Sequence, residues 1–228
     1  MLQIDVITLF PDFFESPLRQ SIIGKALNKD KAKVNVHDLR QFGLGKHQIT
    51  DDRPYGGGPG MVMLVEPIDL ALQSLNYQRG KSGELIALTS AKGKLFSQDT
   101  AGEWSKLKRL CLICGHYEGV DERVAEHLID TEIRIGDYVL TGGEPASLVI
   151  LDSLIRLQPE VLGNQDSLQD ESHAVPGQLS YPQYSRPEVY RDWTIPEVLK
   201  GGHHQEIAKW RQQKTKQVSQ KDNLNSSK

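Results

Sequence analysis

The sequence predicts an α/β protein in which a mostly parallel sheet is flanked by helices. Short apolar runs alternate along the chain with stretches whose apolar residues repeat at helical spacing, and the connections between them are short. Two glycine-bearing polar turns also follow apolar strands within residues 110–156. Open parallel sheets bind ligands at the carboxyl ends of their strands, so these turns mark the expected site.

The first part of the chain supplies two strands, each followed by a helix. Residues 3–9 and the region around 34–36 have the apolar pattern of strands. Residues 18–27 repeat apolar side chains at helical spacing, and residues 68–75 do so directly after Pro67. These four elements begin the expected alternation of strand and helix.

The second part of the chain repeats this alternation. Short buried strands are expected at residues 85–89, 109–114 and 129–135, and helices at residues 97–107, 120–128 and 146–157. Ser97 suits a helix start because its hydroxyl accepts a hydrogen bond from a free amide, and Pro145 suits a first helical turn. The helices expected at 97–107 and 146–157 therefore each have a recognisable start.

The composition changes after residue 162. Residues 163–179 are polar and predict a flexible linker between a sheet domain (1–162) and a small helical domain (180–228). Residues 187–214 carry short helical patterns. The final stretch, 214–228, is nearly all polar, and we expect it to be disordered.

The composition is that of an ordinary globular protein. The 228 residues are 38% hydrophobic and 25% charged, with a net charge of −3, so a nucleic-acid site must be a local patch. The first residues show no signal peptide, and no apolar run is long enough to span a membrane, which favours the cytoplasm. Cys111 and Cys114 have redox-type spacing, but their apolar setting favours ordinary core cysteines.

Two common nucleotide motifs and a metal motif are missing. No GxGxxG follows the first strand, and residues 43–47 fail the P-loop pattern. His203 and His204 are adjacent without further ligand spacing, so we expect no structural metal.

Three glycine-rich loops are the remaining candidates for a ligand site: residues 54–61, 115–119 and 136–143. They could be a flexible connector and two tight turns. Their clustering favours a small-molecule site instead, because glycine lets a ligand approach the backbone closely. Tyrosines and glutamates among the glycines suit a purine, but the residues alone leave the ligand unnamed.

Four long motifs carry a resemblance to a known family. They are DDRPYGGGPGM at 51–61, CGHYEG with DER at 114–123, IGDYVL with GGE at 135–144, and YSRP at 184–187. In this order they closely resemble the bacterial tRNA (guanine-37 N1)-methyltransferases, the TrmD family of the SPOUT superfamily. The resemblance covers about residues 1–212, with Ala91 and His116 departing from the proline and arginine common there.

The resemblance implies a deep trefoil knot between about residues 85 and 156, S-adenosyl-L-methionine as methyl donor, and an active site shared across a homodimer. It leaves a role for Mg²⁺ open. The residues that it assigns to the cofactor belong to three loops, and they are Thr89, Ser90, Ala91, Gly115, Tyr117, Glu118, Gly119, Ile135, Gly136, Asp137, Tyr138, Val139, Leu140, Gly142 and Gly143.

The resemblance also implies the catalytic groups. Guanine N1 carries a proton, so its methylation needs a base, and a fixed cation would stabilise the charge that builds on O6. The family's catalytic arginine matches Arg156. Arg156 could instead be an ordinary surface charge near the end of a helix. The family's aspartate before a serine matches Glu171 without a gap, with Asp170 beside it; either carboxylate could be the base, and we favour Glu171 slightly.

The implied substrate is the tRNA anticodon stem-loop, with guanosine preferred at position 36 and no role for DNA or a membrane. The residues expected to contact it lie in the 51–61 loop and beyond the linker, and they are Arg53, Tyr55, Gly57, Gly58, Ser172, Arg186, His204 and Arg211. Two alternatives remain: methylation of another RNA position, and non-catalytic RNA binding.

Overall fold

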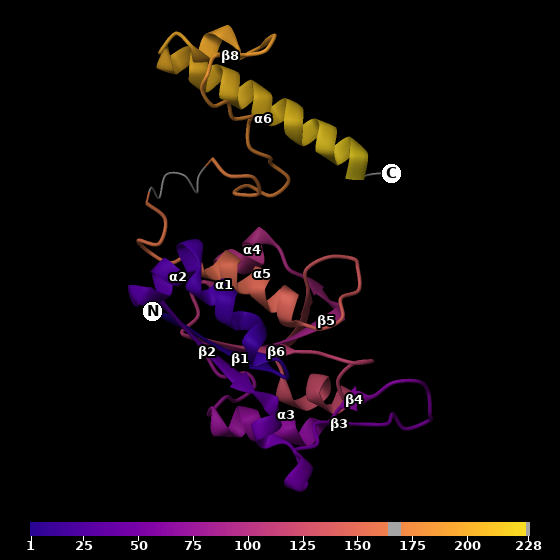
Figure 1. Cartoon of the computed structure of the whole chain (residues 1–228). Coiled ribbons are helices and arrows are strands. Elements are labelled where there is room, and N and C mark those ends of the chain that lie inside the picture. The colour runs from indigo at the N-terminus through magenta and orange to yellow at the C-terminus, as the bar shows by residue number, and fades with distance from the viewer. Residues whose placement is uncertain (164–169, 227–228) are drawn as a thin grey trace. The chain divides into compact units, whose positions relative to one another are not determined.

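The computed structural model describes residues 1–163 and 170–226, with side chains described up to residue 220. The chain forms two compact units, Met1–Gly163 and Asn164–Lys228, called the first and second unit below. Figure 1 follows the chain through both units.

The first unit is built on a five-stranded sheet in the order β2-β1-β6-β5-β7. Every neighbouring pair is parallel, which confirms the α/β class and the parallel sheet. Its strands are β1 (Leu2–Thr8), β2 (Ala32–Asp38), β5 (Glu84–Leu95), β6 (Arg109–Cys114) and β7 (Thr131–Arg134).

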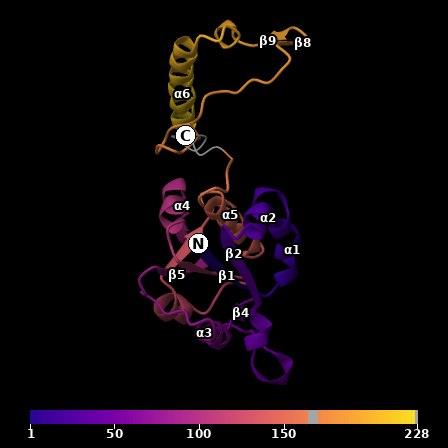
Figure 2. The ribbon, with the colours of Figure 1, turned by 90° about the vertical axis from the view of Figure 1, so that its left-hand side faces the viewer.

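Helices cover both faces of this sheet (Figures 1 and 2). The elements of one face are η1 (Pro11–Phe14), α1 (Glu15–Arg19), α2 (Ser21–Asn28), α4 (Gln98–Trp104) and α5 (Glu144–Ile155). Those of the other face are η2 (Leu39–Phe42), α3 (Val65–Ser74) and the π-helix η4 (Val124–Leu128). A short 3₁₀ helix, η3 (Gly45–His47), lies in the connection after η2. Each face of the sheet thus has its own apolar core.

The two cysteines of β6 show how the strand divides these cores. Cys111 packs in the core beside α3, and Cys114 packs in the core beside α5. Both are fully buried and free among the described residues, and burial raises the pKa of both thiols. The prediction of ordinary core cysteines is confirmed.

Helix starts agree with the sequence, but several lengths do not. Ser97 caps α4 by accepting a hydrogen bond from the Thr100 amide, and Pro145 lies in the first turn of α5. The single helix expected at 18–27 is wrong, because extended backbone at Gln20 separates α1 from α2. The expected helix at 120–128 is reduced to η4. Residues 90–95, beyond the expected strand, continue β5 past a bulge between Thr89 and Lys94.

The second unit contains a long helix, α6 (His204–Ser226), and a short 3₁₀ helix, η6 (Glu197–Leu199). The disorder expected from residue 214 onward is therefore wrong as far as Ser226. Residues 205–226 hold no glycine or proline, so their helix propensity is high although they are polar. Of the predicted linker, residues 164–169 lie outside the described residues. The Leu179 amide, near its end, donates to Ser219 Oγ of α6 at 2.9 Å.

Two small antiparallel pairs were not foreseen. β3 (Asp51–Asp52) pairs with β4 (Val62–Met63) and closes the glycine-rich loop of the first unit. β8 (Val189–Tyr190) pairs with β9 (Trp193–Thr194) in the second unit. Among the described helices, none combines the length and the apolar character needed to cross a bilayer.

Candidate active site

A pocket of about 450 Å³ lies at the carboxyl ends of β6 and β7, beside the bulge in β5. Its lining includes residues 88–92 within β5 and the residues around the ends of the other two strands, namely 115–120, 122, 125, 132–136, 138–143 and 146. This is the edge at which an open parallel sheet binds its ligand. The two turns singled out in the sequence therefore meet in space, together with the bulged part of β5.

The lining, as far as the structure describes it, includes every predicted cofactor residue except Asp137. The Asp137 side chain is 82% exposed and accepts a hydrogen bond from Arg134 Nε at 2.7 Å. Sequence reasoning missed several other lining residues. His116 and Val120 lie beside the glycine turn and could have been included by proximity, whereas Lys92, Glu122, Arg134 and Ala146 gave no sequence signal.

Two glycines bring the three pocket-lining segments, around residues 89, 115 and 143, into contact. The Gly143 amide donates to the Gly115 carbonyl at 2.8 Å. A Cβ atom at Gly143 would lie 1.9 Å from Thr89 Oγ1, and one at Gly115 would lie 2.7 Å from the Thr89 carbonyl oxygen. Thr89 Oγ1 itself accepts from the Gly115 amide at 3.2 Å. Only glycine fits at these two positions, so they fix the floor of the pocket.

A buried carboxylate stands behind this floor. Glu144 begins α5, is only 3% exposed, and accepts a hydrogen bond from Thr8 Oγ1 at 2.7 Å. The positive end of the helix dipole also favours a carboxylate there. His116 Nδ1 is buried and has no hydrogen-bond partner among the described residues. A Cβ atom at Gly142 would lie 2.4 Å from Glu144 Oε2 and 2.6 Å from His116 Nδ1, so the two side chains converge on that glycine.

The rim of the pocket carries charged and aromatic side chains. Lys92 forms an ion pair with Glu122, whose hydrogen bond raises the pKa of Lys92. Tyr117 adopts a left-handed backbone with φ of 60°, and burial together with Asp51 raises the pKa of its hydroxyl. A left-handed conformation at a tyrosine costs energy and is often found at functional sites.

The glycine-rich loop that holds Arg53, Tyr55, Gly57 and Gly58 is anchored to the pocket at one end. The Glu118 amide donates to the Met61 carbonyl at 3.1 Å, and a Cβ atom at Gly60 would lie 2.4 Å from Glu118 Cγ. Tyr55, at the tip of this loop, is fully exposed. The structure therefore joins this loop to a cofactor loop through Glu118 and leaves its tip accessible.

Arg156 lies at the other end of α5 from the pocket. Helix α5 begins at Glu144, and Arg156 is its C-cap residue. At ~1.5 Å per residue, Arg156 lies about 15 Å along the axis beyond Ala146, the last pocket-lining residue. One copy of the chain does not bring Arg156 to its own pocket.

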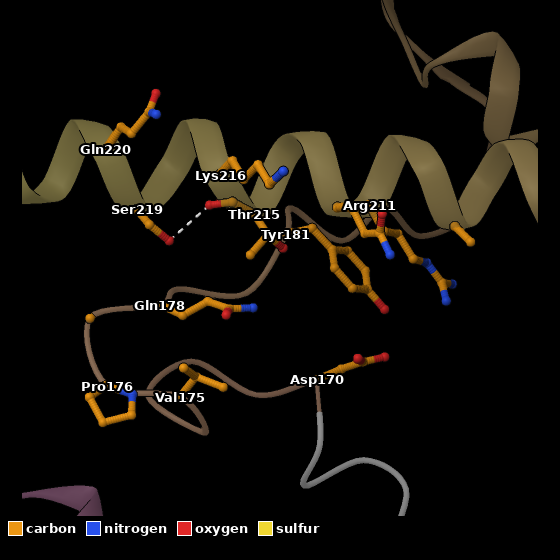
Figure 3. A pocket seen from close by; sticks show the side chains of 13 residues that line it. Asp170, Val175, Pro176, Gln178, Tyr181, Arg211, Thr215, Lys216, Ser219 and Gln220 are labelled. Carbon is orange, nitrogen blue, oxygen red and sulfur yellow. Dashed lines mark hydrogen bonds between the residues drawn. The ribbon is translucent and has the colours of Figure 1, made fainter.

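The two candidate bases belong to the second unit, so they are described apart from Arg156. Asp170 is exposed and lines a second cavity, of about 650 Å³, between residues 170–181 and α6 (Figure 3). Glu171 is half-buried, and its carbonyl accepts a hydrogen bond from the Ala174 amide at 3.2 Å.

The substrate residues predicted in the second unit are exposed. Ser172 Oγ accepts from the Ser180 amide at 2.9 Å. The Arg211 guanidinium lies 4.8 Å from the centre of the Tyr181 ring, beside the second cavity (Figure 3). Arg186 precedes a cis peptide bond to Pro187, and His204 is the first residue of α6. Across the described residues, no group of three His, Cys, Asp or Glu side chains is arranged to hold a metal ion.

The fold and pocket define an α/β protein with a cavity of small-molecule size beside the carboxyl ends of two parallel strands. A family model described as "tRNA (Guanine-1)-methyltransferase TrmD" matches residues 2–226, and the chain belongs to this family.

Curated relatives carry the name tRNA (guanine-N(1)-)-methyltransferase. A relative from Dehalococcoides mccartyi is 45% identical over 214 residues, which cover 94% of this chain and 86% of the relative. A relative from Caldanaerobacter subterraneus is 47% identical over 215 residues, covering 94% and 87%. One from Microcystis aeruginosa is 48% identical over 213 residues, covering 93% and 90%.

Proposed function

We propose that this chain transfers a methyl group from S-adenosyl-L-methionine to N1 of guanosine 37 in tRNA, preferring guanosine at position 36. One observation carries the proposal: the three segments that the family resemblance assigns to the cofactor line one pocket beside the carboxyl ends of β6 and β7. The reaction belongs in the cytoplasm, where tRNA is processed.

The pocket suits the proposed methyl donor. The cofactor supplies an electrophilic methyl group on a sulfonium centre. Backbone groups of residues 89–91, 115, 135–136 and 138–140 are available to its adenosine part, because glycines keep side chains off the pocket floor. The carboxylate of Glu118, a lining residue, favours a cationic ligand, whereas that of Glu122 is already paired with Lys92. The trefoil knot expected around this pocket remains a prediction.

The distance between the pocket and Arg156 supports a homodimer. Because Arg156 follows the far end of α5, we assign it to the pocket of a second copy. Phe13 and Val149, on the α5 side of the sheet, are each 46% exposed and suit an interface between copies. In the completed site the Arg156 guanidinium stabilises negative charge on guanine O6 as the N1 proton leaves.

Either Asp170 or Glu171 removes that proton. The base must come within ~2.6–3.2 Å of N1 or act through one water molecule. Asp170 lines the cavity beside α6, which favours it on accessibility, whereas Glu171 matches the family position. Asp170→Asn and Glu171→Gln, measured separately in single-turnover assays, distinguish them: the base is the residue whose variant loses turnover while cofactor affinity stays normal.

The proposed function is tested with purified protein, cofactor labelled in the methyl group and a set of tRNA transcripts. We expect labelling of a transcript with guanosine at 36 and 37, less when position 36 is changed, and none when guanosine 37 is replaced by adenosine. Equal labelling of the adenosine-37 transcript would overturn the assignment of position 37. Cofactor binding without methyl transfer to any transcript would favour a non-catalytic RNA-binding protein.

A further inference from the structure

The β8–β9 hairpin of the second unit exposes a compact aromatic cluster. The Tyr190 and Trp193 rings lie 5.9 Å apart between centroids with an interplanar angle of 53°. Their residues are 56% and 66% exposed, although large aromatic side chains usually bury most of their area. Figure 2 shows the hairpin on an extended loop, away from α6 of its own unit. Packing within the second unit does not account for this pair of rings.

An arginine completes the cluster from the turn. Arg191 adopts a left-handed backbone with φ of 55°, and its Cζ atom lies 5.5 Å from the Tyr190 ring centre and 5.6 Å from the Trp193 ring centre. Among the described residues, Arg191 forms no ion pair. The strained turn thus places a guanidinium beside both rings and leaves its hydrogen-bond donors available.

The base of the hairpin is held in place. The Ile195 amide donates to the Glu188 carbonyl at 3.1 Å, which extends the pairing of β8 with β9. Lys200, at the end of η6, lies 4.0 Å from the carboxylate of Glu188 and 2.6 Å from that of Glu197. These contacts fix the hairpin to η6, so its aromatic tip is presented on a supported element.

We propose that Tyr190, Arg191 and Trp193 form a stacking platform for an unpaired base of the substrate tRNA, a base other than the guanosine that is methylated. The platform deepens the proposed function and rests on it. Unpaired RNA bases stack on aromatic rings and on arginine guanidinium planes, and both surfaces are present here. Arg191 and Asp192 carry opposite charges side by side, so stacking rather than net charge holds the base.

The test compares the full-length chain with its Tyr190→Ala/Trp193→Ala variant. We expect at least ~5-fold weaker tRNA binding and a matching rise in KM, as for loss of one stacked base, with unchanged kcat at saturating tRNA and unchanged cofactor affinity. The slope of binding against salt concentration stays the same, because the variant removes no charge. Trp193→Phe keeps a ring and retains most of the affinity.

The matched control is Val189→Ala, which trims another exposed side chain of the same hairpin (Val189 is 51% exposed) and leaves tRNA binding unchanged. Transcripts that each lack one base of the anticodon loop identify the stacked base. The transcript without that base binds the wild type and the double variant equally, because it has nothing to stack on the rings. Wild-type methylation together with unchanged tRNA binding in a folded double variant overturns the platform and leaves the proposed function standing. A double variant that binds tRNA normally but loses its dimer assigns the rings to a second copy and also overturns it. Absence of methylation by the wild type contradicts the proposed function itself.

Discussion

The two units of the chain offer different kinds of surface to their ligands. The pocket of the first unit is shaped by backbone, because glycines at 115 and 143 bring three loops into contact and leave no space for a Cβ atom. The second unit presents exposed side chains, among them the rings of Tyr190 and Trp193. The comparison indicates a preformed site for the proposed methyl donor. The proposed RNA contacts are made instead by separate exposed side chains, each of which a single substitution can remove.

The largest effect is expected from Arg156→Ala. Removing a cation that stabilises charge in the transition state costs ~100- to 1000-fold in turnover. Cofactor affinity should stay normal, because Arg156 lies beyond the far end of α5 from the pocket. Single-turnover methylation and equilibrium cofactor binding measure the two effects. A near-normal rate would remove Arg156 from the mechanism.

Gly143→Ala tests whether the pocket is set by the backbone. Its Cβ atom would lie 1.9 Å from Thr89 Oγ1 and 2.9 Å from the Gly115 nitrogen, so the loops must separate. We expect ~1–3 kcal/mol lower stability and at least ~10-fold weaker cofactor binding, measured by urea unfolding and calorimetry. Gly102→Ala is the matched control, because a Cβ atom there would meet nothing within 4 Å and alanine stabilises a helix. Normal cofactor binding by the Gly143 variant would contradict a rigid floor.

Asp5→Asn tests how the first unit responds to pH. Burial alone would raise the pKa of Asp5, but hydrogen bonds from His37, Asn35, Gln3 and Tyr77 outweigh it and hold that pKa well below its usual range. Because the pKa of Asp5 is lower in the folded than in the unfolded chain, ionised Asp5 stabilises the fold at pH values above its unfolded-state pKa of ~3.9. This stabilisation is lost as the pH falls from there toward the folded-state pKa. In urea unfolding, the variant should be less stable at pH 7 and lose less stability between pH 7 and pH 3. Equal losses in both proteins would contradict this account.

Thr8→Val, the last of the four variants, tests the support behind the pocket and is expected to change stability. It removes the hydrogen bond from Thr8 Oγ1 to the buried Glu144 carboxylate and the one that Thr8 accepts from the Phe10 amide. We expect a loss of ~1.5–3 kcal/mol in the unfolding transition of the first unit, as for hydrogen bonds to charged groups. Thr100→Val, at a half-buried position of α4, removes only an exposed hydroxyl contact and serves as the control. Equal stability of the two variants would remove Thr8 from the support of the pocket.

Sequence reasoning succeeded where a local signal was strong. The six apolar-rich residues of β6, the Ser97 cap and the proline in the first turn of α5 are local features. It failed where the signal was weak or long-range. Two-residue strands such as β8 and β9 have no periodicity to detect, and the polar end of α6 resembled a disordered tail.

The candidate site was predicted as a set of loops but not as a geometry. The approach of Gly143 to Thr89 joins positions far apart in the chain, and only the folded sheet brings them together. The separation of Arg156 from the pocket also depends on the direction of α5, which a motif does not specify. From the sequence, only the family resemblance indicated that a second copy is needed. The structure supports this through the distance between Arg156 and the pocket of its own chain.

The most direct test of this account mixes two defective chains. One chain carries Arg156→Ala and has an intact pocket. The other carries Gly143→Ala and retains Arg156; Gly115→Ala replaces Gly143→Ala if it folds better. Purified heterodimers carrying two different tags are assayed for methylation of a guanosine-37 transcript. If Arg156 acts in its partner's pocket, the heterodimer has one complete site and, at a cofactor concentration too low to fill the altered pocket, recovers about half of the wild-type rate, although each parent is nearly inactive there. A heterodimer as inactive as its parents would contradict the shared site.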